Sequence, residues 1–562
     1  MKQNITVWFQ ARYFAGGLNG ILFGLFTAAL LHGSGNLLGQ LKETSFEYTN
    51  LPLVVINTNS QAIVDEPKIT AAIKIIYNGF SAQNRPEDPG NVYEGLCGIE
   101  LRGTYSQQLP QKPYGFETRD ELGNNNNVSL LGMPSENDWI LLANYNDKTF
   151  MRNTLAFHLF ETMGHYAPRA RFCEVIVNDE YDGIYILTEK IKQDNNRVDI
   201  AKLDEDDNAG DSLTGGYMFK TDYFDESNSW LSAYSPLDRP DGQVYFVYSY
   251  PEPDAITTYQ KDYLQNFINT YETFLYSADY KDLQQGYRAF INMGSFIDYF
   301  IIGELSRNID AYKKSAYFFK EKINKGGLLN RGPVWDFDWA WKNMNNNCDI
   351  FAATDCSGWA FQVNDCKNRP VAPAWIVRLM QDYSFQDEVH TRYFDLRKTI
   401  LSEDYINNYI DSIHLLVEDA QERHYERWPI LGINVGTPEV DYQPDTYDGE
   451  IVKFKNWIKK RLSWLDDNMP GEYIVTNADA LTVTMPALRI FPNPARDILF
   501  FESDQTLYKI ELYSTTGELK IVKMPGRIYS SAIDVSHLNP GLYIIKATFD
   551  NDEIKTGRII VE

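Results

Sequence analysis

Two aspartates stand two residues apart in the segment GPVWDFDWAW, which otherwise holds mainly aromatic and small apolar residues. Alternate residues of an extended segment face the same side, so Asp336 and Asp338 are expected to point at one place. Two like charges buried beside tryptophans are unfavourable unless something positive neutralises them. Divalent cations prefer oxygen ligands, so the pair predicts a metal site. The alternative is two solvated acids at an exposed strand end.

Three further segments carry groups that suit phosphoryl transfer. The segment ELRGTYSQQLPQKPYGFE joins Gly, Ser and Thr residues to Lys112, a combination that suits a polyphosphate. Glu189 ends the apolar segment GIYILTEK, where it can pair with a lysine, face a cleft or lie on the surface. Asp310 follows a long apolar segment, and a carboxylate there can accept a proton from an attacking hydroxyl. Read in chain order, these groups are the parts that phosphoryl transfer needs.

The elements that must position these groups change character along the chain. From Leu51 to about Leu203, alternating segments predict strands, including a hairpin over RFCEVIVNDEYDGIYILTEKI. One helix is predicted there, over DKTFMRNTLAFHLFETMG, with an Asp at its start and Gly164 at its end. From about Gln260 the apolar spacing is mainly helical. This order indicates an α+β architecture with a β-rich N-terminal lobe and an α-rich C-terminal lobe.

Six segments in order resemble the successive motifs of the CotH family, which comprises atypical, secreted protein kinases. They are IELRGTYSQQLPQKPYGFE, NDWILLANYNDKTFMRNTLAFHL, NDEYDGIYILTEKI, GGYMFKTD, RNIDAYKKSAYFFK and GPVWDFDWAW, which fall between about residues 93 and 345. The resemblance continues more faintly through the later helices. It implies a kinase-like two-lobe fold that binds ATP with Mg²⁺ or Mn²⁺ and phosphorylates Ser or Thr of protein substrates.

The resemblance also implies roles for individual residues. Asp310 would be the catalytic acid/base, and Asp336 or Asp338 would hold the metal. The residues that would serve the nucleotide are Lys112, Glu189 and Arg102. Arg152, on the predicted helix, is expected to pair with a nearby acid rather than with phosphate.

Two departures from the family pattern leave a second interpretation open. The family writes its lysine motif as Pro-Lys-Lys, whereas this chain has Gln111 in the first place, so Lys112 is not securely the equivalent lysine. An Asn commonly follows the family's catalytic Asp, and here Ser315 is the nearest polar substitute. The alternative is therefore a catalytically silent pseudokinase that acts as a structural or binding protein at the cell surface. A glycan hydrolase is disfavoured, because glycosidase carboxylates flank a bond across about 5–9.5 Å.

The N-terminus reads as a secretory signal. Lys2 and Arg12 precede the stretch YFAGGLNGILFGLFTAALLHGSG, which is apolar and ends in small residues. The apolar part is short for a membrane span, so we predict a cleaved signal peptide over 1–33, with an uncleaved anchor as the alternative. No later segment is apolar enough to cross a bilayer, so the mature chain is expected to have no transmembrane segment.

The C-terminus has short alternating segments separated by turn sequences, which predict a small antiparallel β-sandwich. The series resembles the C-terminal sorting domain of the type IX secretion system of Bacteroidetes-type bacteria. The matching residues are Pro492, Asn493, Pro494, Gly517, Leu538, Gly541, Tyr543 and Lys555. The resemblance implies contact with the type IX machinery, passage through the periplasm and outer membrane, and a final place at the cell surface or in the medium. An ordinary accessory sandwich is the alternative.

Composition and cysteine use agree with export. The net charge of −25 disfavours binding to nucleic acid, which is itself negatively charged. Five cysteines in an exported chain permit disulfides, and one bridge is expected among Cys348, Cys356 and Cys366, with the pairing open. A zinc site is less favoured, because no paired C-x-x-C is present. The predicted domains are a CotH-like domain over 45–468, a linker over 469–488 and a sorting domain over 489–562.

Overall fold

The structure is a computed structural model that describes residues 46–79, 82–345, 347–474, 488–491, 495, 498–515, 517–524, 528–549 and 554–561. The predicted signal peptide and the Pro492–Asn493–Pro494 motif lie outside these residues. In the described ranges, no helix combines the length and the apolar character that a membrane crossing requires.

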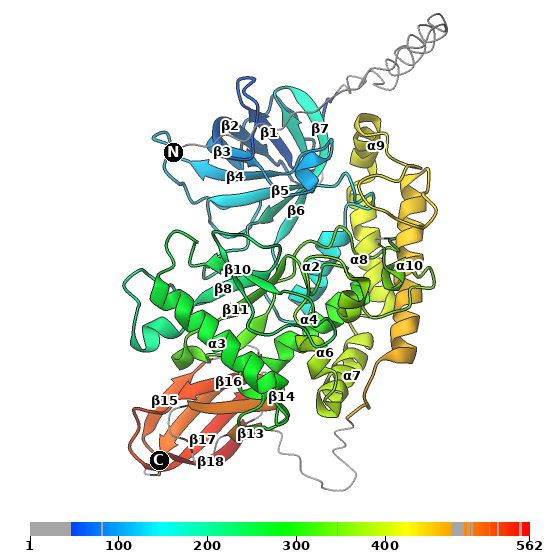
Figure 1. Ribbon diagram of the computed structural model, residues 1–562. Helices are drawn as coiled ribbons and strands as arrows, with labels where there is room; N and C mark the ends of the chain where they lie inside the picture. Colours follow the sequence, from blue (N-terminus) through cyan, green and yellow to red (C-terminus); the bar gives the residue numbers. More distant parts are fainter. Residues whose placement is uncertain are drawn as a thin grey trace, which may run out of the picture. The chain divides into compact units, whose positions relative to one another are not determined.

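Seven N-terminal strands close into a barrel in the order β1-β2-β3-β4-β5-β7-β6 (Figure 1). Neighbouring strands are antiparallel except β1 and β6, whose parallel pairing closes the ring. Alternation of buried and exposed residues along β2 shows why these segments form strands around an apolar interior. The predicted β6–β7 hairpin is confirmed. The strands are β1 (Leu53–Asn57), β2 (Ile69–Ile76), β3 (Tyr93–Leu101), β4 (Tyr114–Arg119), β5 (Asp138–Ala143), β6 (Ala170–Val177) and β7 (Glu180–Glu189).

A second sheet of five strands follows, in the order β12-β11-β8-β10-β9. The sequence analysis did not predict this sheet, because its strands β8 and β11 are almost 100 residues apart and only the folded chain pairs them. The region after the barrel is therefore less purely helical than expected. The strands are β8 (Tyr217–Thr221), β9 (Ser229–Leu231), β10 (Tyr245–Tyr250), β11 (Ala316–Lys320) and β12 (Leu329–Arg331).

Most of the remaining regular secondary structure up to residue 468 is helical, as the apolar spacing predicts. The helix α4 is unusual because every one of its residues is buried, so it forms the centre of this part of the core. It ends at Arg307, which adopts a left-handed conformation with φ +44°. The helices are α2 (Arg152–Thr162), α3 (Thr258–Tyr276), α4 (Met293–Ser306), α5 (Asp349–Ala352), α6 (Trp375–Leu379), α7 (Tyr383–Arg397), α8 (Glu403–Leu416), α9 (Glu418–Arg427) and α10 (Tyr447–Asn468).

The C-terminal strands form one six-stranded antiparallel sheet with its own apolar core. The long strand β14 pairs with β13 and β16 along its first half, and with β15 and β17 along its second half. The predicted antiparallel arrangement is confirmed, and it is a single sheet in which two groups of strands share β14. The strands are β13 (Leu488–Phe491), β14 (Ile498–Ser514), β15 (Leu519–Lys523), β16 (Ile528–Asp534), β17 (Gly541–Phe549) and β18 (Ile554–Val561).

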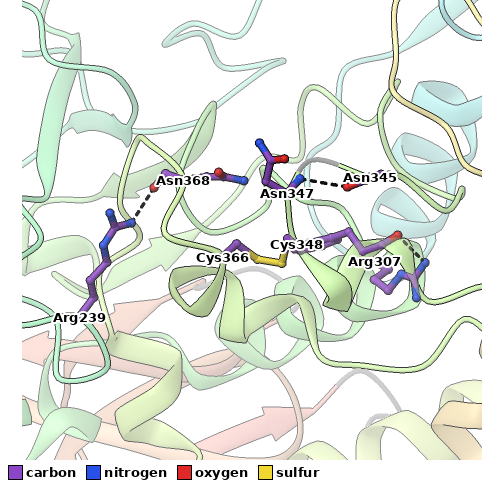
Figure 2. Close-up of a disulfide and its surroundings, with 8 residues drawn as sticks. Arg239, Arg307, Asn345, Asn347, Cys348, Cys366 and Asn368 are labelled. Carbon is purple, nitrogen blue, oxygen red and sulfur yellow. Dashed lines mark hydrogen bonds between the residues drawn. A yellow bond between two sulfur atoms is a disulfide. The ribbon is translucent and has the colours of Figure 1, made fainter.

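One disulfide joins Cys348 to Cys366 and closes the loop between them, which confirms the bridge expected among the three clustered cysteines (Figure 2). Cys356, within the same loop, is a buried free thiol. Cys97 and Cys173 are also free and buried in the barrel strands.

A buried ion pair attaches α9 to the barrel, and this contact yields a stability prediction. Glu174 on β6 is fully buried and accepts hydrogen bonds from Arg423 (2.7 Å) and from the Tyr181 hydroxyl (2.5 Å). Arg423→Ala leaves a buried carboxylate without its cation, so we expect unfolding free energy to fall by on the order of 3 kcal/mol. Arg427 on the same helix lies 3.9 Å from the exposed Glu180 and provides the matched control. Arg427→Ala should cost less than about 1 kcal/mol in urea titrations, and equal losses for the two variants would contradict the assignment.

Candidate functional site

The segment that carries Asp336 and Asp338 is irregular, which corrects the expectation of an extended segment. Asp336 has φ +60°, and a turn begins at Asp338. Phe337, between them, is fully buried and donates its backbone N–H to the Asn153 side chain at 2.7 Å. The burial of Phe337 therefore sets the direction of the two carboxylates, rather than strand alternation.

Each carboxylate of the pair has a neutral hydrogen-bond donor. The Ser315 hydroxyl donates to Asp336 at 2.7 Å, and the Asn146 carboxamide donates to Asp338 at 2.6 Å. Burial, and next the negative charge of Asp336, raise the pKa of Asp338. The two carboxylates therefore share one poorly hydrated region, as the sequence suggested. An irregular backbone, and not the expected extended segment, brings them there.

Asp310 is tied to the same region through Asn308. The Asn308 carboxamide accepts the backbone N–H of Asp310 at 3.0 Å and donates to the backbone carbonyl of Asp336 at 3.1 Å. Burial would raise the pKa of Asp310, but the ammonium groups of Lys313 (3.1 Å) and Lys314 (3.5 Å) outweigh burial and hold that pKa below its ordinary value. Asp310 is therefore held as a carboxylate, the form that can accept a proton.

Cations complete the site. Burial opposes the charge of Lys314, yet the three aspartates outweigh burial and raise the pKa of its ammonium group. Burial lowers the pKa of Arg102, whose guanidinium lies 5.3 Å from the centre of the Trp335 ring, and Asp336 acts in the opposite direction. The site thus combines carboxylates with fixed positive charges, the composition that suits a metal-bound phosphate group.

Two residues predicted to serve a nucleotide make other contacts. The Lys112 ammonium donates to the backbone carbonyl of Gln107 at 2.9 Å, inside its own loop. Glu189 is fully buried and pairs with Arg169 at 2.8 Å. Among the described residues, no hydrogen bond or ion pair joins Lys112 or Glu189 to the three aspartates. The structure therefore brings Arg102, but not these two, to the carboxylates, and the nucleotide roles remain predictions.

Gln111, in the place of the family's first lysine, is fully buried in the barrel. Its carboxamide donates to the backbone carbonyls of Asp182 (3.2 Å) and Ile184 (3.0 Å) and accepts the backbone N–H of Asn144 at 3.0 Å. A lysine has no acceptor and could not reproduce the last of these bonds. The barrel backbone at this position therefore requires a side chain that both donates and accepts, as glutamine does.

Sequence reasoning missed Asn146, Asn308 and Lys314. The motif RNIDAYKKS offered a signal for the last two, since both lie within four residues of Asp310. Asn146 follows β5, far from the aspartates in sequence, and only the fold could reveal it. The prediction for Arg152 is confirmed, because its guanidinium pairs with Asp147 at 3.1 Å.

The donor set is compatible with a hard divalent cation. Within the described ranges, no three or more His, Cys, Asp or Glu side chains converge as metal ligands, so Asp336 and Asp338 stand as a pair. Mg²⁺ commonly takes one or two protein carboxylates and completes its coordination with water and substrate phosphates. Burial, and next the charge of Asp336, raise the pKa of Asp338, and a bound cation would neutralise the negative charge of the pair.

Two family models match the chain. The family model described as CotH kinase protein matches residues 99–465, and that of the secretion system C-terminal sorting domain matches residues 489–562. No curated protein matches the chain. A solved structure, CopC from Methylosinus trichosporium OB3b, aligns with 13% of this chain and 80% of its own at 15% identity, and its TM-score of 0.11 carries no argument.

The sorting domain indicates export through the type IX secretion system to the cell surface or the medium. The CotH match spans more than half of the sequence and includes Arg102, Asp310, Asp336 and Asp338. The chain therefore belongs to the CotH kinase protein family and carries a secretion system C-terminal sorting domain.

Proposed function

We propose that this exported protein is a kinase that transfers the γ-phosphate of ATP to Ser or Thr hydroxyls of protein substrates. The observation that carries the proposal is the link from Asn308 to both Asp310 and Asp336, which fixes an ionised carboxylate beside a carboxylate pair suited to a metal. A kinase-like division into a β-rich and an α-rich lobe, with the nucleotide between them, is part of the same proposal.

In this proposal Asp336 and Asp338 hold Mg²⁺ or Mn²⁺, and Asp310 accepts the proton of the attacking hydroxyl. The bound metal ion would neutralise negative charge on the phosphate oxygens. Lys314 and Arg102 lie where they can neutralise the remaining charge, because both interact electrostatically with Asp336. Ser315 and Asn146 orient the metal carboxylates through their hydrogen bonds.

The first prediction of this proposal concerns metal-dependent nucleotide binding. Millimolar ATP with Mg²⁺ or Mn²⁺ should raise the melting temperature, since a ligand at 100 times its Kd stabilises the folded state by about 2.7 kcal/mol. Asp336→Asn or Asp338→Asn should abolish the shift, and removal of the metal with EDTA should do so in the wild type. Asp395→Asn is the matched control, because this carboxylate lies on α7 and pairs with Lys398 at 2.7 Å. The absence of any shift in the wild type would refute nucleotide binding.

The second prediction separates chemistry from binding. Asp310→Asn preserves shape but cannot accept the hydroxyl proton, so phosphate transfer should fall by roughly 10²–10⁴-fold while the ATP-induced melting shift remains. Autophosphorylation and transfer to added protein, measured by mass spectrometry, provide the readout. Equal phosphate incorporation by wild type and variant, or none by either while both bind ATP, would replace the kinase assignment with the pseudokinase alternative.

The third prediction concerns the C-terminal domain. Deletion from Ile490 onward should leave the protein trapped inside the cell envelope of its native host, because the deleted strands form the sorting domain. Fractionation of cells and medium measures the outcome, and full-length Asp310→Asn serves as a control that should be exported normally. A truncated chain that still reached the surface or the medium would overturn the sorting role.

A further inference from the structure

The loop closed by the Cys348–Cys366 disulfide is fixed by charged side chains outside it (Figure 2). Three buried residues supply these contacts: Glu304 in the last turn of α4, Arg307 immediately after that helix, and Arg461 on α10. A loop whose backbone groups are satisfied by buried charges is positioned rigidly, since breaking any bond leaves a buried charge poorly solvated.

Arg307 makes the most extensive of these contacts. Its guanidinium donates to the backbone carbonyls of Ser357 (2.7 Å), Phe351 (3.1 Å) and Ala353 (3.2 Å). All three carbonyls lie within the disulfide-closed loop. The planar fork of an arginine can reach several carbonyls at once, which a lysine cannot do.

Glu304 and Arg461 hold the same loop from the other direction. The Glu304 carboxylate accepts the backbone N–H groups of Ala360 (2.7 Å) and Phe361 (2.8 Å). Arg461 donates to the carbonyls of Cys356 (2.9 Å) and Gly358 (2.7 Å), and it also contacts the Glu304 carboxylate at 3.3 Å. The loop and the end of α4 therefore form one hydrogen-bonded unit.

This unit leads directly into the candidate site. Arg307 has φ +44°, a conformation that a residue with a side chain rarely adopts, so external contacts must maintain it. The next residue is Asn308, whose carboxamide bonds the backbone of both Asp310 and Asp336. The backbone N–H of Trp341 also donates to the Ser306 carbonyl at 2.8 Å, which ties the aspartate-bearing segment to the same turn.

We propose that Arg307 is a positioning residue for Asp310 and Asp336, and that the disulfide-closed loop holds Arg307 in its left-handed conformation. Dithiothreitol would give two electrons and two protons to the bridge, leaving two thiols and a cyclic disulfide of the reagent. The opened loop gains conformational entropy and holds the guanidinium less firmly. The kinetic part of this inference rests on the proposed kinase function, whereas the structural part does not.

The test compares Arg307→Gln, the Cys348→Ser/Cys366→Ser double variant, and wild type with and without dithiothreitol, all as the full chain. Amide hydrogen exchange should become faster over residues 306–315 and 336–341 in each altered form, with the barrel strands unchanged. The kcat for phosphate transfer should fall by roughly 10- to 100-fold with the KM for ATP unchanged, because the aspartates are misplaced rather than removed.

Arg397→Gln is the matched control, because Arg397 on α7 is a part-buried arginine that pairs with Asp466 at 2.8 Å, away from the loop. It should leave exchange over 306–315 and 336–341 unchanged. Should Arg307→Gln fail to fold, Arg307→Lys and the reduced wild type provide the same readout. The inference would be overturned if the folded variants and the reduced wild type all exchanged amide hydrogens over both segments as slowly as the oxidised wild type. Faster exchange with no phosphate transfer by wild type would uphold positioning and refute the kinase function.

Discussion

The candidate site depends on one carboxamide, that of Asn308. Three aspartates with limited access to water repel one another, and such a group is stable only where cations and hydrogen-bond donors offset the repulsion. Asn308 fixes the backbone on both sides of this group, and Lys313 and Lys314 supply positive charge from the same turn. Bonds to the main chain thus hold the backbone of this group in place, while Ser315 and Asn146 each donate to one oxygen of the Asp336/Asp338 pair.

The rigidity of Asn308 in turn derives from α4. A helix buried on every side cannot shift without disturbing the core around it, because protein interiors are close-packed. Glu304 in its last turn and Arg307 just after it bond the disulfide-closed loop, and the following Asn308 bonds the segments that carry the aspartates. An export route is consistent with this design, since a disulfide forms and persists in an oxidising compartment.

The barrel contributes to the site through Arg102, after β3, and Asn146, after β5. Gln111 does not reach the site, because its carboxamide forms hydrogen bonds with backbone groups of the barrel. A lysine at position 111 would be a buried cation and would leave the Asn144 N–H without an acceptor. Position 111 therefore cannot carry the lysine of the family pattern in this chain. Arg102 and Lys314 interact electrostatically with Asp336, and in the proposed function they are the cations that neutralise phosphate charge.

The sequence by itself determined the family and the sorting domain at the C-terminus, and it singled out Asp310, Asp336 and Asp338 as candidate site residues. Those features are local, since motifs, turn sequences and runs of apolar residues each depend on residues that are close together in the sequence. Tertiary structure alone decided that Asn146 and Asn308 orient the aspartates, that Glu189 pairs with Arg169, and that Cys348 bonds Cys366 and not Cys356. Each of these depends on which distant segments pack together, and packing is set by the burial of whole elements such as α4, not by local spacing.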